Sequence, residues 1–205
     1  PAQDLSVAQS LDDTSPTPFA FLMGLSAAIA SIIQRADLWI MGYFLSQPEI
    51  GVYQVAMRLT VPLTALLGAL NTALWPRASA LTSASQTLRL LRSTFAASGV
   101  AAIGSLVYAA FVPLLTPVLF GAEYKSGVLL GQLLCLRYCI SLLICPIGVI
   151  GYSFGLVRTY WLINLLQLAV TVGLSVFLLP RIGAAGAAIA LIANDTVGAV
   201  VAGAI

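Results

Sequence analysis

The chain has 205 residues, of which 60% are hydrophobic and 8% are charged, and its formal net charge is +2. Its mean hydropathy is +1.02. Because soluble domains contain roughly 25% charged residues, this composition excludes an ordinary soluble protein and predicts an all-α membrane protein. The sequence contains no histidine, which excludes imidazole general-base catalysis and histidine-ligated metals.

The first seventeen residues are polar and include three aspartates and two prolines. We expect residues 1–17 to form a cytoplasmic linker, and the lack of a basic stretch there argues against a signal peptide. The chain starts at Pro1 and stops at Ile205 within an apolar run. We therefore expect it to be a piece of a longer protein.

Six apolar segments follow the linker and form the predicted bundle of residues 18–205. Each is long enough to cross the ~30 Å hydrocarbon core of a bilayer as a helix. Pro62 and Pro76 are expected to kink the second helix, and Ser85 is the expected N-cap of the third. The predicted spans cover residues 18–45, 50–80, 93–122, 127–154, 159–179 and 184–205.

The distribution of positive charge predicts the orientation in the membrane. The connector 77–92 and the turn at Arg158 carry four arginines on the side of Pro1, whereas Lys125 and Arg181 lie on the other side. Since cytoplasmic loops are enriched in Lys and Arg, we expect Pro1 on the cytoplasmic side of the inner membrane.

The first span contains two charged residues within its apolar run. As a helix, residues 18–45 would be about 42 Å long, with Arg35 and Asp37 about 15 and 12 Å from its outer end. An ionisable group at that depth costs at least about 2.5–3.5 kcal/mol and normally faces a bundle interior or a wet cavity. Both residues are therefore candidates for function. The alternative is that they pair or reach toward the headgroups and only stabilise helix packing.

Counting residues from the outer helix ends places other charged groups at matching depths. Asp37 and Arg58 both lie about 12 Å from that end, so they can meet. Arg137 and Asp195 both lie about 18 Å deep. Because residues two apart point to nearly opposite sides of a helix, pairing of Asp37 would direct Arg35 toward a cavity or toward a missing partner.

Polar and small residues recur at helical spacing in four of the predicted helices. Such stripes indicate either close helix packing with interhelical hydrogen bonds or a hydrated path beside intramembrane charge. We favour close packing for the sixth helix, which contains Asn194, and a hydrated path for the second and fourth. The stripes include Gln54 and Arg58, then Arg137, Ser141 and Cys145, then Tyr160, Asn164, Gln167 and Thr171.

The sequence carries no recognisable catalytic, metal or cofactor site. Cys135 and Cys139 lie one helical turn apart, which is poor geometry for a disulfide, and they lack the further ligands of a zinc site. With Cys145 they are predicted to be small packing residues. No phosphate-binding glycine loop, nucleophile–base pair or carboxylate cluster is present. We predict a non-enzymatic protein with no cofactor and no nucleic-acid partner.

Four stretches are RADLWIMGYFLSQPEIGVYQVAMRL (35–59), LWPRASAL (74–81), LFGAEYKSG (119–127) and LLPRIGAAGAAIA (178–190). Together they resemble the polysaccharide-biosynthesis flippases of the MATE-like exporter superfamily, which includes O-antigen and exopolysaccharide flippases. The resemblance implies twelve spans in two six-helix halves, of which this chain matches the second. It also implies that an undecaprenyl-pyrophosphate-linked oligosaccharide crosses to the outer leaflet by alternating access around a cationic cavity.

The leading hypothesis is a flippase whose partners are a lipid-linked oligosaccharide, membrane lipids and a missing N-terminal six-helix half. Asp37 and Arg58 match the acidic and basic positions of the family pattern, whereas Arg35 and Arg137 are assigned from burial. One alternative is a multidrug or peptidoglycan-precursor exporter of the same fold, and another is a non-transporting membrane scaffold whose charges all pair. The expected cavity cations are Arg35, Arg58 and Arg137, and the expected charge-pair or ion-coupling groups are Asp37, Asp195 and Asn194.

Overall fold

The computed structural model describes residues 17–81, 83–153 and 157–203, and all of the elements in these ranges are helical. This agrees with the prediction, since backbone N–H and C=O groups in a bilayer must be satisfied within each segment. Residues 1–16 of the predicted linker lie outside the described ranges. The helices are α2 (Thr17–Phe44), α3 (Gln47–Leu59), α4 (Val61–Ser79), α5 (Ala84–Phe120), α6 (Val128–Ser153), α7 (Val157–Ile182), α8 (Ala184–Gly203) and the 3-10 helix η1 (Ala122–Gly127).

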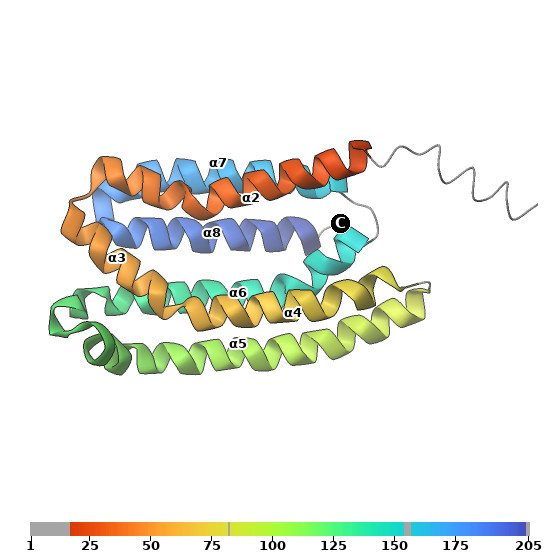
Figure 1. Cartoon of the computed structure of the whole chain (residues 1–205), viewed down its shortest axis with the longest axis horizontal. Coiled ribbons are helices and arrows are strands. Elements are labelled where there is room, and N and C mark those ends of the chain that lie inside the picture. The colour runs from red at the N-terminus through yellow and green to blue at the C-terminus, as the bar shows by residue number, and fades with distance from the viewer. Residues whose placement is uncertain (1–16, 82, 154–156, 204–205) are drawn as a thin grey trace, which may run out of the picture.

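The helices are arranged in two layers (Figure 1). One layer contains α2, α7 and α8, the other contains α4, α5 and α6, and α6 packs against α8 to join them. At one end of the bundle α3 crosses from the first layer to the second. The shared core lies near that end and includes Met41, Tyr53, Leu134, Leu179 and Ala187. The layers are therefore packed together where α3 crosses.

Four described helices are long and apolar enough to cross a membrane, and the bent pair α3–α4 makes a fifth candidate. They span Ser85–Phe120, Ala122–Gly151, Thr159–Ile182 and Ala184–Val201. The prediction of a multi-pass membrane protein is confirmed at this level. The sixth span, which corresponds to α2, and the twelve-helix arrangement stay predictions.

The second predicted helix is broken into α3 and α4, with a bend of 45°. The predicted kink at Pro62 is therefore present. Because proline has no N–H, Pro62 cannot donate to the Arg58 carbonyl. The Leu63 amide donates to the Thr60 carbonyl rather than to that of Leu59. The Leu59 carbonyl accepts a hydrogen bond from the Tyr108 hydroxyl of α5 at 2.9 Å. A side chain from the neighbouring helix thus satisfies backbone that the break exposes.

The connector predicted for residues 82–92 is helical almost throughout, because α5 begins at Ala84. The N-cap is Ser83 rather than Ser85, and its Oγ accepts a hydrogen bond from the Gln86 amide at 3.4 Å. Leucine, arginine and glutamine in this stretch are good helix formers, so their polarity does not interrupt the helix. The residues between the predicted spans 93–122 and 127–154 are likewise helical, because they lie in the 3-10 helix η1.

The reversal between α7 and α8 follows the prediction. Gly183 adopts φ +63°, which glycine reaches without steric cost, and its amide donates to the Leu179 carbonyl at 3.0 Å. α8 then packs closely along α7 because Gly186 has no side chain where it faces Leu178. Figure 1 places this reversal at the end where α3 crosses, opposite the α4–α5 connection. Which end faces the cytoplasm stays a prediction, and the side chain of Arg158 lies outside those described.

Candidate functional site

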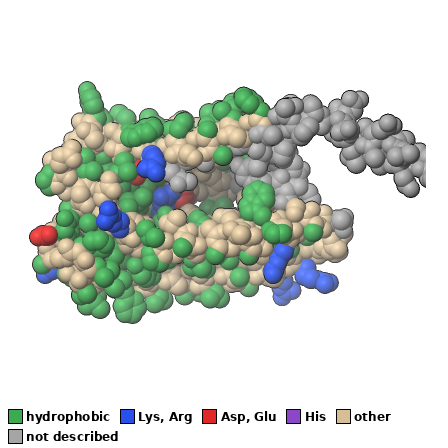
Figure 2. Space-filling view, in the orientation of Figure 1, with side chains coloured by type: hydrophobic (Ala, Val, Ile, Leu, Met, Phe, Trp, Pro, Cys, Tyr) green, Lys and Arg blue, Asp and Glu red, His purple; other side chains and the backbone are tan. Residues whose placement is uncertain are grey.

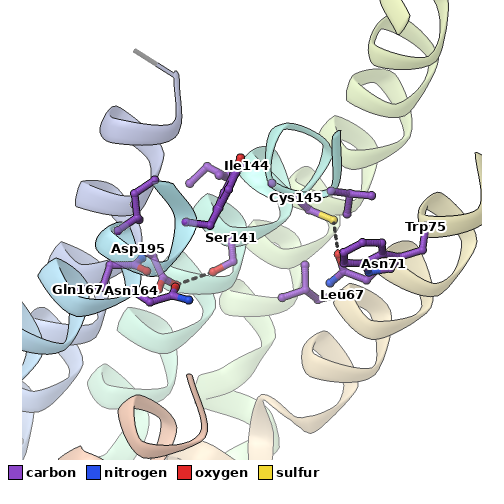
Figure 3. A pocket seen from close by; sticks show the side chains of 14 residues that line it. Leu67, Asn71, Trp75, Ser141, Ile144, Cys145, Asn164, Gln167 and Asp195 are labelled. Carbon is purple, nitrogen blue, oxygen red and sulfur yellow. Dashed lines mark hydrogen bonds between the residues drawn. The ribbon is translucent and has the colours of Figure 1, made fainter. Parts of the chain in front are cut away.

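A groove of about 290 Å³ lies between α4 and α6 on one side and α7 and α8 on the other. Figure 2 shows a hollow where the two layers part, with basic and acidic side chains beside it. Figure 3 shows its lining, with amide and carboxylate groups of α7 and α8 facing polar groups of α4 and α6. The polar residues that line it are Asn71, Ser141, Asn164, Gln167 and Asp195.

An ion pair between α6 and α8 lies at the base of this groove. The Arg137 Nε donates to the Asp195 Oδ2 at 3.0 Å, and the two side chains are 15% and 13% exposed. The Ser141 hydroxyl donates to the same carboxylate oxygen at 2.5 Å. Counting depths along the sequence placed Arg137 and Asp195 at one level, and the structure brings them together. The guanidinium of Arg137 is therefore neutralised and is not a free cavity cation.

Asn194 fixes the other side of this carboxylate. Its Nδ2 donates to the Asp195 Oδ1 at 2.8 Å, and its Oδ1 accepts from the Thr171 hydroxyl at 3.0 Å. The backbone carbonyl of Asn194 accepts from the Gln167 Nε2 at 3.1 Å. The buried amide thus ties α7 to α8, and its geometry assigns it to positioning the Asp195 carboxylate. Interhelical hydrogen bonds of this kind are a common means of holding membrane helices together.

The structure does not pair Asp37 with Arg58. Asp37 is 1% exposed, and its carboxylate accepts from the Tyr53 hydroxyl at 2.5 Å and from the Leu38 amide at 2.9 Å. The reason is the register of the turn between α2 and α3. Because α3 begins at Gln47 and not at the predicted residue 50, the level of Asp37 on α3 moves by almost one helical turn, away from Arg58 and toward Tyr53.

The two carboxylates and one guanidinium form a buried group between the layers. Arg137 lies within electrostatic range of Asp37 and Tyr53 as well as of its partner Asp195. Tyr53 is the member that the sequence analysis missed. Its signal was the symmetry of the α2–α3 hairpin, since Asp37 and Tyr53 lie equally far from Leu45 along the chain.

Arg35 and Arg58 are both exposed. Within the part of the chain that the structure describes, Arg137 and Asp195 form an ion pair, whereas neither of these arginines has a carboxylate partner. The prediction placed both inside the bundle because each interrupts an apolar run. The helices instead turn them outward. Their roles as cations that bind a substrate stay predictions.

The three cysteines are buried and free, in line with the packing role predicted for them. Cys145 also contributes a polar contact to the groove, because its thiol donates to the Asn71 Oδ1 at 3.2 Å. This contact ties α4 to α6 beside Trp75, as Figure 3 shows.

The family described as polysaccharide biosynthesis protein matches residues 16–129, more than half of the chain. The chain belongs to the polysaccharide biosynthesis protein family. No curated protein and no solved structure gives a significant match. The matched region covers α2 to α5 and η1, and it contains three of the four stretches on which the resemblance depends. Arg137 and Asp195 lie beyond it.

Proposed function

We propose that this protein is a membrane flippase that moves a polyprenyl-pyrophosphate-linked oligosaccharide across the cytoplasmic membrane during synthesis of a cell-surface polysaccharide. The main support is the groove between the two layers, where amide, hydroxyl and carboxylate groups lie among apolar side chains. Its amides and hydroxyls suit the hydroxyl groups of a sugar. A groove between helices also leaves a polyprenyl tail in the bilayer while the head group passes.

Arg35 and Arg58 are the proposed ligands of the pyrophosphate. Guanidinium groups bind phosphate oxygens with two parallel hydrogen bonds, and neither arginine has a carboxylate partner among the described residues. Arg137 has a different proposed role, because Asp195 holds it. The pair fixes α6 against α8 and keeps one wall of the groove in place during transport.

The proposed transport cycle is the one that the family resemblance implies. A second six-helix half of the full-length protein would supply the opposite wall, and the two halves would rock to open the groove to each side in turn. Asp37, whose carboxylate is buried and forms no ion pair with an arginine among the described residues, is the proposed group for coupling to an ion. A multidrug exporter would need acidic groups free to bind its substrate, whereas Asp195, the acidic residue that lines the groove, is held by Arg137.

Polysaccharide export tests the proposal in cells that carry the full-length protein. Arg35→Gln and Arg58→Gln are each expected to lower export about tenfold at equal protein level, because a hydrogen bond to a charged group contributes about 1.5–3 kcal/mol. Arg181→Gln is the control, since Arg181 is exposed and stacks on Phe177 at the end where α7 meets α8. Normal export in both test variants would refute the role of the arginines.

Thiol labelling separates a transporter from a scaffold. Asn164→Cys places a thiol in the groove and is made together with Cys145→Ser, because Cys145 also lines the groove, whereas Cys135 and Cys139 are buried. A membrane-impermeant maleimide is expected to label it in the full-length protein, and substrate lipid is expected to slow the labelling. A thiol that stays unlabelled would indicate a dry bundle and would favour the scaffold.

A further inference from the structure

The stretch from Ile50 to Ala122 contains no aspartate or glutamate but four arginines. Three of these, Arg77, Arg89 and Arg92, lie where α4 ends and α5 begins, and all three are exposed. Figure 2 shows basic side chains gathered at this end of the lower layer. The positive charge here has no acidic residue nearby in the sequence to offset it.

A second pocket lies within this basic end. Its volume is about 390 Å³, and Arg77 of α4 and Arg89 of α5 both line it. Ser93 and Gln86 contribute polar groups, and the remaining lining is apolar, from Ala80, Leu81 and Leu90. Two guanidinium groups over an apolar floor match an amphiphilic ligand whose charged part is a phosphate.

The length of α5 places the pocket at the membrane surface. With 37 residues, α5 is about 55 Å long, well beyond the ~30 Å hydrocarbon core. Its first turns, which carry Arg89, therefore extend to the level of the lipid headgroups. Trp75, which is 40% exposed, lies half a helical turn before Arg77, and tryptophan is enriched at this interface. Leu88 is also exposed beside the pocket.

We propose that the pocket lined by Arg77 and Arg89 binds the phosphate headgroup of an anionic phospholipid from the leaflet at this end of the bundle. The arginines bind the phosphate, and Leu81 and Leu90 contact the glycerol and acyl region. A lipid suits the site better than a soluble anion because exposed apolar side chains surround the charge. The lining of this pocket shares no residue with that of the groove, to which Trp75 belongs, and the site does not depend on the transport proposal.

Quenching of Trp75 fluorescence by brominated lipids tests the site. The full-length protein is reconstituted in lipid with Trp75 as its single tryptophan. Trp39, Trp161 and any tryptophan in the rest of the full-length protein are replaced by Phe. Trp39 is exposed, and the Trp161 Nε1 has no hydrogen-bond partner among the described residues, so both changes are mild. Brominated phosphatidylglycerol is expected to compete several-fold better than brominated phosphatidylcholine for the position beside Trp75.

Variants decide whether the two arginines cause this preference. Each of Arg77→Gln and Arg89→Gln is expected to lower it about fivefold, the equivalent of about 1 kcal/mol for one cation at an anionic surface. The R77K/R89K variant keeps the charge and is expected to stay within about twofold of the parent. Lys125→Gln, at the opposite end, is the control and should change nothing.

Three results would overturn the proposal. The first is equal quenching by the two lipids in the parent, and the second is a preference that survives the double R77Q/R89Q change. The third is loss of the preference in millimolar inorganic phosphate at constant ionic strength, which would assign the pocket to a soluble anion. If the R77Q/R89Q variant fails to insert into the membrane, the R77K/R89K variant can still be measured. A preference as low in R77K/R89K as in the glutamine variants would contradict the role of charge.

Discussion

Replacing Asp195 by asparagine removes one charge from the ion pair and changes almost nothing in shape. Asparagine retains one oxygen that can accept from Ser141. The Arg137 guanidinium, however, loses its carboxylate partner at 3.0 Å while it remains 15% exposed. An unpaired charge in a nearly dry site is unfavourable because no water replaces the lost partner.

The magnitude follows from burial and from the number of bonds. Breaking a fully buried ion pair by removing one partner costs about 3–5 kcal/mol. The residual exposure of both side chains admits some water, so the lower end of this range applies, about 3 kcal/mol. For a chain of this size, that corresponds to a fall in the unfolding temperature of about 6–12 °C.

Thermal unfolding of the purified protein in detergent measures this fall. A double-mutant cycle with Arg137→Gln is the matched control, because D195N/R137Q leaves neither partner of this ion pair charged and is expected to recover part of the loss. An unfolding temperature for Asp195→Asn close to that of the parent would refute the reasoning. Strictly additive losses in the double variant would do the same, since they would mean that the two groups do not interact.

Two further perturbations test the contacts between neighbouring helices. Tyr53→Phe removes the hydroxyl that donates to the Asp37 carboxylate and is expected to lower the free energy of unfolding by about 1.5–3 kcal/mol, seen as a lower unfolding temperature. Gly186→Ala would place a Cβ 2.8 Å from the Leu178 carbonyl carbon, so we expect a loss of about 1–3 kcal/mol. Gly173→Ala is its control within α7, because nothing lies within 4 Å of the added Cβ, and it should be neutral or stabilising by up to about 1 kcal/mol. Equal effects of the two alanine changes would contradict the close approach of α7 and α8.

The helical fold followed from the sequence because apolar composition and the need to satisfy backbone groups leave few alternatives in a bilayer. The pair of Arg137 and Asp195 also followed, since α6 and α8 begin at residues 128 and 184, within one residue of the predicted starts. Counting along uninterrupted helices then gives the correct depth. This success depends on helix ends that the sequence marks clearly, with η1 before one helix and Gly183 before the other.

The same method failed for Asp37 because its partner helix starts three residues before the predicted position. The residues after Ser46 are polar, which places them between the predicted spans 18–45 and 50–80. In the structure Ser46 is the N-cap of α3, and its amide and hydroxyl donate to the Glu49 carboxylate at 2.9 and 2.7 Å. Polar residues in a first helical turn satisfy free backbone groups, so polarity alone could not locate this boundary.

The exposure of Arg35 and Arg58 is the second feature that the sequence does not predict. A charge within an apolar run predicts membrane depth, but it does not say which side of a helix faces the protein. Arg35 and Ala36 are neighbours in sequence, and one is exposed while the other is buried. Only the packing of α2 against α7 decides between them.

The small residues of α8 determine the distance between the two layers. Ala187 and Ala188 are fully buried in the core that the two layers share. A helix with short side chains lets its neighbours approach to near backbone contact. A larger side chain at these positions would increase the distance between the layers. The width of the groove between α4 and α7 therefore depends on α8, although Asp195 and Gly198 are the α8 residues that line it in the described part of the chain.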